Sequence, residues 1–382
     1  MDDTIYIDHN ATTPPLPEVI AAVCGAMGLT GANPSSVHAN GRAARKLIED
    51  ARAAVATLVG AVPEEVVFTS GGSESNNTVI IGAGRRRILV PPTEHAAVLK
   101  TVLTRSVDSD LISIDHNGLV DIQGLEALLA ESEEPALVCV MAANNETGVL
   151  QPMAEISELA HRHGALVHCD AVQAVGKIPV DVMTWGVDYL ALSGHKIGGP
   201  QGIGSLVRCG DAPLSSLISG GGQEHGLRAG TENVAAISGL GVAAQIAADT
   251  LAEKSVRLKG YRDALEAGIK ALSPTTMIFC EEAPRLPNTS NFTLPGVRSD
   301  RQLMALDLAG VSVSAGSACS AGKVEPSHVL DSMAVDPEIS TTALRASFGW
   351  SSEAVDVDRF LDAWGDLARR ESAGVLEEIS AA

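Results

Sequence analysis

Two short stretches decide how this chain folds: SGHKIGGP at residues 193–200 and HCDAVQ at residues 168–173. Lys196 lies in a polar, glycine-rich turn, where its amine can form a Schiff base with an aldehyde cofactor. Asp170 follows an apolar run, where its carboxylate can keep a pyridinium nitrogen protonated. Pyridoxal phosphate needs both groups, because its protonated ring takes up the electrons of a carbanion at the substrate's α-carbon. A surface lysine and a helix-capping aspartate would explain each residue alone, but the pair favours this cofactor.

Strand-like runs alternate with helical patterns through the first two-thirds of the chain. The helical patterns include residues 41–59 and 153–163. Short buried strands between helices predict a mainly parallel sheet with helices on both faces, and therefore an α/β fold. The expected strands are residues 66–69, 87–90, 136–140, 165–168, 189–192 and 203–207.

The polar motifs of this region follow the expected strands. Gly71, Asn144, Asp170 and Lys196 each come at the end of such a run. Ligands of parallel sheets bind beyond the carboxyl ends of the strands. We therefore expect these motifs to meet at one edge of the sheet.

The last third of the chain has a different pattern of helical and strand-like segments, which predicts a second, smaller α+β domain. We expect the large domain over residues 15–259 and the small one over residues 1–14 and 260–382. The elements expected around and beyond this boundary are helices at 232–250, 258–272, 301–308 and 354–370 and strands at 277–280 and 290–294.

Composition and charge limit the classes of ligand. The chain has 382 residues and a formal net charge of −20, which argues against nucleic acid and anionic membranes as direct ligands. We expect no signal peptide and no membrane span, because we find neither a basic segment before an apolar run nor about 18 consecutive apolar residues. The six cysteines form no C-x-x-C pair, so we expect neither a metal site nor a disulfide framework, and a reducing cytoplasm as the compartment.

A loop and two single residues are further candidates for the site. TSGGSESN at residues 69–76 follows a strand and opens a helix, so Gly72 and Ser73 could bind a phosphate; an ordinary glycine turn is the alternative. Asn145 could contact the cofactor ring or a substrate carboxylate, or only leave the strand in an Asx-turn. His95 could stack on the ring and move protons, although a lone histidine is more often structural.

Three more candidates lie later in the chain. Cys319 has only small neighbours in GSACSAG, residues 316–322, which predicts an accessible thiol. Arg345 could clamp a substrate carboxylate with two hydrogen bonds, or be a plain surface arginine. The glycine-rich stretch at residues 220–233 is either a flexible loop or, ending in a helix cap at Thr231, a source of anion contacts.

Together these motifs resemble the NifS/IscS-type cysteine desulfurases, in the class V aminotransferase group of fold-type I pyridoxal phosphate enzymes. The likeness runs from YIDHNATTP at residues 6–14 to about residue 349, with SGHK, RAGTEN and GSAC in that order. It implies the seven-stranded sheet of that fold and a homodimer. Two positions depart from the usual pattern, because His225 replaces an arginine and WSS at residues 350–352 replaces RFT.

The resemblance also implies a role for each candidate. Lys196 carries the cofactor, Asp170 pairs with the pyridine nitrogen, Gln173 meets the ring hydroxyl and His95 stacks on the ring. Asn145 and Arg345 hold the substrate carboxylate, and Cys319 accepts the sulfur. The phosphate is held by Gly72, Ser73, Ser193 and His195, and by Thr231 of the other subunit.

The implied reaction converts L-cysteine to alanine and leaves a persulfide on Cys319 for a sulfur acceptor. The sequence does not identify the acceptor, which could serve iron–sulfur cluster assembly or the thiolation of tRNA or DNA. Three other functions stay open: a selenocysteine lyase or aminotransferase on the same fold, a non-catalytic protein that binds the cofactor, and a sulfur-delivery partner whose activity depends on an acceptor. Formation of alanine together with a persulfide would separate the desulfurase from the first two.

Overall fold

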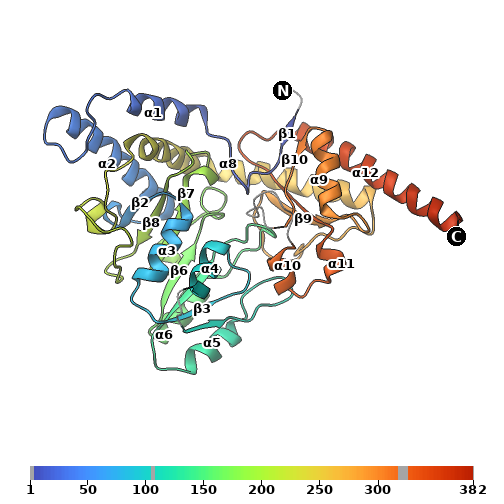
Figure 1. The fold of residues 1–382 in the computed structure, drawn as a ribbon, viewed down its shortest axis with the longest axis horizontal. Helices are drawn as coiled ribbons and strands as arrows, with labels where there is room; N and C mark the ends of the chain where they lie inside the picture. Colours follow the sequence, from blue (N-terminus) through green and yellow to red (C-terminus); the bar gives the residue numbers. More distant parts are fainter. Residues whose placement is uncertain (1–3, 105–107, 317–325, 382) are drawn as a thin grey trace.

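The computed structural model describes residues 4–104, 108–316 and 326–381, and its centre is a seven-stranded sheet (Figure 1). The strand order is β2-β8-β7-β6-β5-β3-β4, and only β8 runs antiparallel to its neighbours. The mainly parallel sheet predicted from the sequence is therefore confirmed. The strands are β2 (Val66–Thr69), β3 (Arg87–Val90), β4 (Asp108–Leu111), β5 (Ala136–Met141), β6 (Leu166–Asp170), β7 (Tyr189–Ser193) and β8 (Gly204–Arg208).

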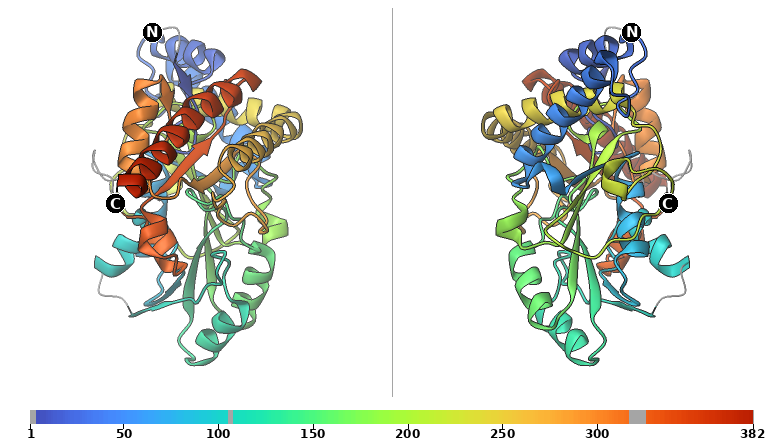
Figure 2. Two further views of the ribbon diagram at one scale, coloured as in Figure 1. Left: turned by 90° about the vertical axis from the view of Figure 1, so that its right-hand side faces the viewer. Right: turned by 90° about the vertical axis from the view of Figure 1, so that its left-hand side faces the viewer.

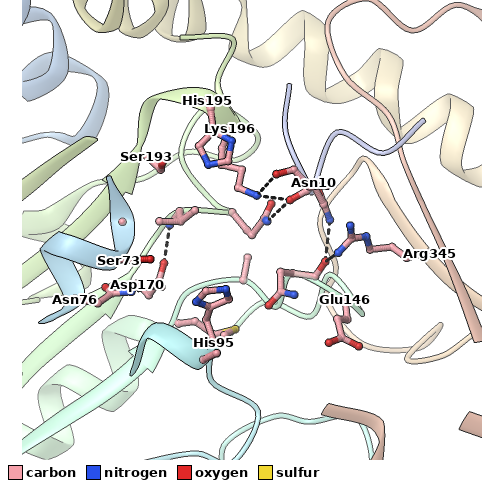
Figure 3. A pocket seen from close by; sticks show the side chains of 18 of the residues that line it. Asn10, Ser73, Asn76, His95, Glu146, Asp170, Ser193, His195, Lys196 and Arg345 are labelled. Carbon is pink, nitrogen blue, oxygen red and sulfur yellow. Dashed lines mark hydrogen bonds between the residues drawn. The ribbon is translucent and has the colours of Figure 1, made fainter. Parts of the chain in front are cut away.

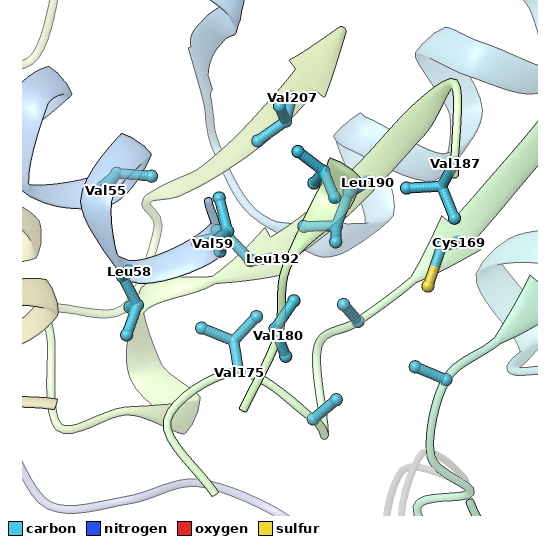
Figure 4. Packing of buried hydrophobic residues seen from close by; sticks show 14 of the residues in the cluster. Val55, Leu58, Val59, Cys169, Val175, Val180, Val187, Leu190, Leu192 and Val207 are labelled. Carbon is cyan, nitrogen blue, oxygen red and sulfur yellow. The ribbon is translucent and has the colours of Figure 1, made fainter. Parts of the chain in front are cut away.

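Helices cover both faces of this sheet, because successive side chains of each buried strand point to opposite sides. In β2, Val66 and Phe68 join one core cluster and Val67 joins another. Figure 4 shows the first cluster, in which Val55 and Val59 of a helix belong to the same packed group as Leu190 and Leu192 of β7. The helices of this region are α1 (Pro17–Met27), α2 (Ala39–Val59), α3 (Gly72–Gly82), α4 (Ala96–Thr104), α5 (Ile122–Ala130), α6 (Met153–Arg162) and α7 (Val182–Trp185).

A second core forms between two small sheets and the helices α8, α9 and α12. Phe292 lies edge-on to Phe360 and to Trp364, with ring centroids 5.8 and 6.1 Å apart, and all three side chains are buried. Helix α12 faces the viewer in the left-hand view of Figure 2. The elements of this region are β1 (Ile5–Tyr6) parallel to β10 (Val311–Ser312), β9 (Thr289–Thr293) antiparallel to β11 (Ala343–Ser347), α9 (Ser299–Leu308), α10 (His328–Ser332), α11 (Pro337–Ser340) and α12 (Ala354–Ala381).

One long helix connects the two cores. Helix α8 (Val234–Leu272) packs against α1 and α2 at one end and α12 at the other. The separate helices predicted at 232–250 and 258–272 are therefore wrong, because no proline breaks the intervening residues. The proposed boundary at residue 259 falls inside this helix, and the domain division stays a prediction.

Helix α8 bears on the expectation that the chain has no membrane span. Among the described residues it alone is long and apolar enough, by length and composition, to cross a membrane. A core helix passes the same test, and α8 has many buried residues, among them Leu240, Leu258 and Ile269. Its contacts with three helices identify it as a core helix.

Three further details differ from the sequence-based expectations. Strand β4 was not predicted, because its sequence DSDL is polar and it lies at the edge of the sheet. The strand expected at 277–280 makes only one bridge, Ile278 to Phe292, and turns away at Cys280, whose φ is 55°. Helix α12 continues to Ala381, beyond the predicted end at residue 370.

Candidate active site

The loops that follow the central strands enclose a cavity of about 290 Å3 (Figure 3). Its lining brings together almost all of the candidates: Gly72, Ser73, His95, Asn145, Asp170, Gln173, Ser193, His195, Lys196 and Arg345. Thr231 is exposed and is not part of this lining. Cys319 lies outside the described residues.

Lys196 ends the short 3-10 helix η2 (Gly194–Lys196), directly after β7. Its Nζ donates hydrogen bonds to the main-chain oxygens of Asn10 and Ala11, the latter at 2.7 Å. The amino-terminal arm, the segment that contains Asn10 and Ala11, is fixed to the same turn, because the Thr13 amide donates to the His195 carbonyl at 2.8 Å. The amino-terminal arm therefore holds the amine in the cavity.

Asp170 stands at the end of β6, and two hydrogen bonds fix its carboxylate. Oδ1 accepts from the Val172 amide at 3.0 Å, and Oδ2 accepts from Asn76 Nδ2 at 2.7 Å. His168 Nε2 lies 2.9 Å from Asn76 Oδ1, and burial lowers the pKa of His168 to about 4. A neutral His168 therefore donates through Nε2, which makes Asn76 Nδ2 the donor to Asp170.

A second buried carboxyl group, that of Glu94, lies close enough to Asp170 to interact with its charge. Glu94 is fully buried, and its Oε1 accepts from the Met141 amide. Burial raises the pKa of Glu94 well above its usual range, and the charge of Asp170 adds to this effect. The neutral acid is therefore favoured at Glu94, so it adds no second negative charge beside Asp170.

The glycine loop before α3 brings backbone close to the cavity. Gly71 has a φ of 153°, and a Cβ on Gly72 would lie 2.6 Å from Val172 Cγ2. A side chain at position 72 would crowd Val172, and with glycine there the first turn of α3 offers backbone N–H groups beside the Ser73 and Ser193 side chains. An adjoining cavity of about 410 Å3 is lined by this loop and by Ser193 and His195.

Two histidines of the cavity wall have defined surroundings. His95 precedes α4, and its Nδ1 accepts from the Ala97 amide at 3.1 Å, which fixes the ring toward the cavity (Figure 3). His195 Nδ1 lies 3.0 Å from Thr12 Oγ1. Burial, together with the charges of Lys196 and Lys177, lowers the pKa of His195 to about 4. His195 is therefore neutral at neutral pH.

The opposite side of the cavity carries the candidate carboxylate clamp. Arg345 of β11 is buried, and its Nη1 donates to the Asn145 main-chain oxygen at 2.9 Å. Its Nη2 pairs with Asp8 Oδ1 at 2.7 Å, and Asp8 Oδ2 accepts from Ser314 Oγ at 2.6 Å. Within the described part of the chain, Arg345 Nε has no hydrogen-bond acceptor. The guanidinium thus keeps donors for a further acceptor.

Sequence reasoning missed five residues around the cavity: Asn10, Asn76, Glu146, Lys177 and His328. Four of them line it, and Lys177 lies behind it. Asn10 stands in the quoted YIDHNATTP and Asn76 in the quoted glycine loop, so both stretches contained the signal. What the sequence does not reveal is that Asn10 acts through its main-chain oxygen as well as its side chain.

The cavity suits pyridoxal phosphate by the chemistry of its donors. One wall presents an amine, a carboxylate and a glycine loop with hydroxyl side chains, and the other an arginine. An aldehyde, a pyridine nitrogen, a phosphate and a substrate carboxylate need these four kinds of group.

Comparisons with known proteins match this arrangement. The family model described as Aminotransferase class-V matches residues 5–360. An IscS-like cysteine desulfurase of Mycobacterium tuberculosis is 40% identical, covering 97% of this chain and 98% of that protein. A cysteine desulfurase of Cereibacter sphaeroides is 42% identical, covering 94% of each. A NifS-like protein from Rickettsia africae has a solved structure with a TM-score of 0.88 and 36% identity, covering 95% of this chain and 99% of that one.

Proposed function

This chain belongs to the aminotransferase class-V family and is a cysteine desulfurase, and we propose that it moves the sulfur of L-cysteine onto Cys319 while Lys196 holds pyridoxal phosphate. The observation that carries this proposal is that Lys196, Asp170 and Arg345 line one cavity. The reaction needs no oxidant, because L-cysteine and an enzyme thiol give alanine and an enzyme persulfide.

The residues on the sheet side of the cavity would hold the cofactor. When bound, pyridoxal phosphate supplies an aldehyde that condenses with amines and a protonated ring that takes up electrons. Lys196 Nζ would hold the aldehyde, and the Asp170 carboxylate would keep the proton on the ring nitrogen. Gln173 would meet the ring hydroxyl and His95 the ring face. The phosphate would be held by Gly72, Ser73, Ser193 and His195.

The other residues would bind the substrate and move its protons. Arg345 and Asn145 bind the carboxylate of L-cysteine, since the guanidinium keeps N–H donors beyond those given to Asp8 and the Asn145 main chain. Lys196 Nζ would remove the α-proton of L-cysteine. The carbonyl oxygens of Asn10 and Ala11 would stabilise the resulting ammonium.

The described residues on either side of Cys319 support its role. Ser314 Oγ donates to Asp8, the partner of Arg345, and Ser327 Oγ donates to Glu146 Oε2 at 2.5 Å. Both acceptors lie at the substrate side of the cavity. We propose that the Cys319 thiolate attacks the sulfur of the bound L-cysteine, so that the Cβ–S bond breaks and a new S–S bond forms.

A second copy of the chain would complete the phosphate site. Thr231 is exposed and does not reach its own cavity. Large apolar side chains are exposed on α1 and on the loop before Thr231: Ile20, Met27, Leu217 and Ile218. Burial of these side chains against a second copy would stabilise a dimer. We propose a homodimer in which each subunit places Thr231 at the phosphate of the other.

A separate protein would accept the sulfur from Cys319, in iron–sulfur cluster assembly or in nucleic-acid thiolation. We place this reaction in the cytoplasm. The cysteines of the described residues are free, which suits a reducing compartment: Cys24, Cys139, Cys169, Cys209 and Cys280.

The test is incubation of the purified protein with L-cysteine, followed by mass spectrometry of the Cys319 peptide and assay of alanine. One added sulfur atom on Cys319, with alanine formed in step, is expected. Alanine without an enzyme persulfide would indicate a lyase, and a bound cofactor without turnover would indicate a binding protein.

A further inference from the structure

Behind the cavity lies a buried amine that the proposed reaction does not use. Lys177 is 5% exposed, and its Nζ donates to Asn10 Oδ1 at 2.8 Å and to Gln173 Oε1 at 2.5 Å. No carboxylate pairs with it among the residues that the structure describes. The charged groups around it are Lys196, Arg345 and Lys254, all of them cations. A buried lysine without a carboxylate partner destabilises a fold, so a positional role would explain its presence.

The first consequence concerns Gln173, which lines the cavity. Because Lys177 Nζ donates to the Gln173 side chain, Oε1 lies on the side of Lys177. Nε2 must then face the other way, where it donates to the Asn10 main-chain oxygen at 2.9 Å. Gln173 therefore presents an N–H donor, and not an oxygen, toward a ligand of the cavity.

The second consequence concerns Asn10, which is almost completely buried. Its Oδ1 accepts from Lys177 and, at 3.3 Å, from Asn288 Nδ2. Its Nδ2 is thereby turned toward Asn145, whose main-chain oxygen lies 3.2 Å away. The main-chain oxygen of the same residue receives Lys196. One amine thus fixes the residue that contacts both the reactive lysine and the substrate-side loop.

We propose that Lys177 is a positioning residue, which fixes Asn10 and Gln173 so that Lys196 and the bound cofactor meet a carbonyl oxygen and an N–H donor at set places. Burial, and then the charge of Lys196, lowers the pKa of Lys177 well below its usual range. The neutral amine keeps two N–H donors, which are enough for both hydrogen bonds. The part that concerns Gln173 and the cofactor rests on the proposed function.

The test compares Lys177→Met with Lys254→Met in the full-length protein. Lys254 lines the same small cavity behind Lys196, and the structure gives it no hydrogen bond to Asn10 or Gln173. We expect Lys177→Met to bind pyridoxal phosphate about tenfold more weakly, as the loss of one fixed donor predicts. Its visible absorbance maximum, and the pH dependence of that band, should also shift. Lys254→Met should match the wild type in both measurements.

A double-mutant cycle with Gln173→Leu separates positioning from a general loss of packing. If Lys177 acts through Gln173, Lys177→Met should weaken binding by less than about twofold once Gln173 is replaced. An unaltered spectrum and affinity in Lys177→Met would overturn the inference, as would fully additive effects in the cycle. Should Lys177→Met not fold, Lys177→Leu, which also lacks a side-chain N–H donor, takes its place in the cycle. Failure of the wild type itself to bind pyridoxal phosphate would instead contradict the proposed function.

Discussion

Arg345 and Asp8 form an ion pair of 2.7 Å at the substrate side of the cavity, and the arginine side chain is 2% exposed. The two residues come from β11 and from the arm after β1, which are far apart in the sequence. The pair therefore ties the amino-terminal arm to the residue proposed to bind the substrate carboxylate. Its loss should affect stability as well as binding.

We predict that Asp8→Ala lowers the free energy of unfolding by about 3 kcal/mol, because it leaves a buried guanidinium without its partner. Denaturant unfolding measures the loss. Asp300→Ala is the matched control, since Asp300 pairs with Arg298 at the surface and an exposed pair contributes about 0–1 kcal/mol. Equal losses in the two variants would contradict a structural role for the buried pair.

Substrate binding tests the other member of the pair. Arg345→Lys keeps a positive charge but removes the planar fork of donors, so KM for L-cysteine should rise about tenfold or more while kcat falls less. Steady-state assay of alanine gives both constants. A fall in kcat at unchanged KM would show that Arg345 does not hold the substrate in its ground state.

Much of the fold could be predicted because the central strands are apolar and the helices between them are regular. The edge strand β4 could not, since only one neighbour pairs with its polar residues. Those site residues whose side chains belong to the quoted motifs, such as Lys196 and Asp170, could also be predicted. Asn10 and Lys177 were missed because the contacts of Asn10 join residues far apart in sequence, 186 positions from Lys196 and 167 from Lys177.

The buried His168 predicts a pH dependence of stability. Burial lowers its pKa to about 4 from an ordinary 6.5, so the unfolded chain binds more protons between these values. The contribution of His168 is complete above pH 6.5 and is lost as the pH falls toward 4. The difference between these two pKa values corresponds to about 3 kcal/mol in the free energy of unfolding.

Denaturant unfolding at several pH values tests this prediction with His168→Gln. The variant should lose less stability than the wild type between pH 6.5 and pH 4, and His225→Gln, on an exposed loop, should follow the wild type. Parallel curves for all three proteins would contradict the assignment of this loss to His168.

Lys196 should be the point of attachment of the cofactor. Reduction of the holoenzyme with borohydride should leave a cofactor adduct on the Lys196 peptide and remove the visible band. Lys196→Ala should give no adduct there, while Lys254→Ala should behave as the wild type does. An adduct on another lysine in the wild-type protein would show that the assignment is wrong.

Thr231 tests the proposed dimer. Lys196→Ala and Thr231→Ala should each have low activity as pure dimers, because one lacks the amine and the other a phosphate contact. Mixed and refolded together, they should form some dimers with one intact site and recover part of the activity. A fully active monomer, identified by light scattering, would exclude a site shared between subunits.

The sulfur-accepting step depends on Cys319. Cys319→Ser should leave cofactor binding unchanged, because that depends on Lys196 and Asp170. Sulfur release from L-cysteine should fall by orders of magnitude, since a neutral hydroxyl cannot attack sulfur as a thiolate does. The measurements are alanine and sulfide formation, with mass spectrometry of the Cys319 peptide in the wild type.

Cys139 and Cys169 provide the controls for this last step. Both thiols are buried, and burial raises their pKa values well above the usual range, so neither supplies a thiolate at neutral pH. Replacing either with Ala should change stability, because each side chain packs in the core, and leave the persulfide yield unchanged. Near-normal alanine formation by Cys319→Ser would rule out transfer to this thiol, and a lyase that acts without an enzyme thiol would then account for the site.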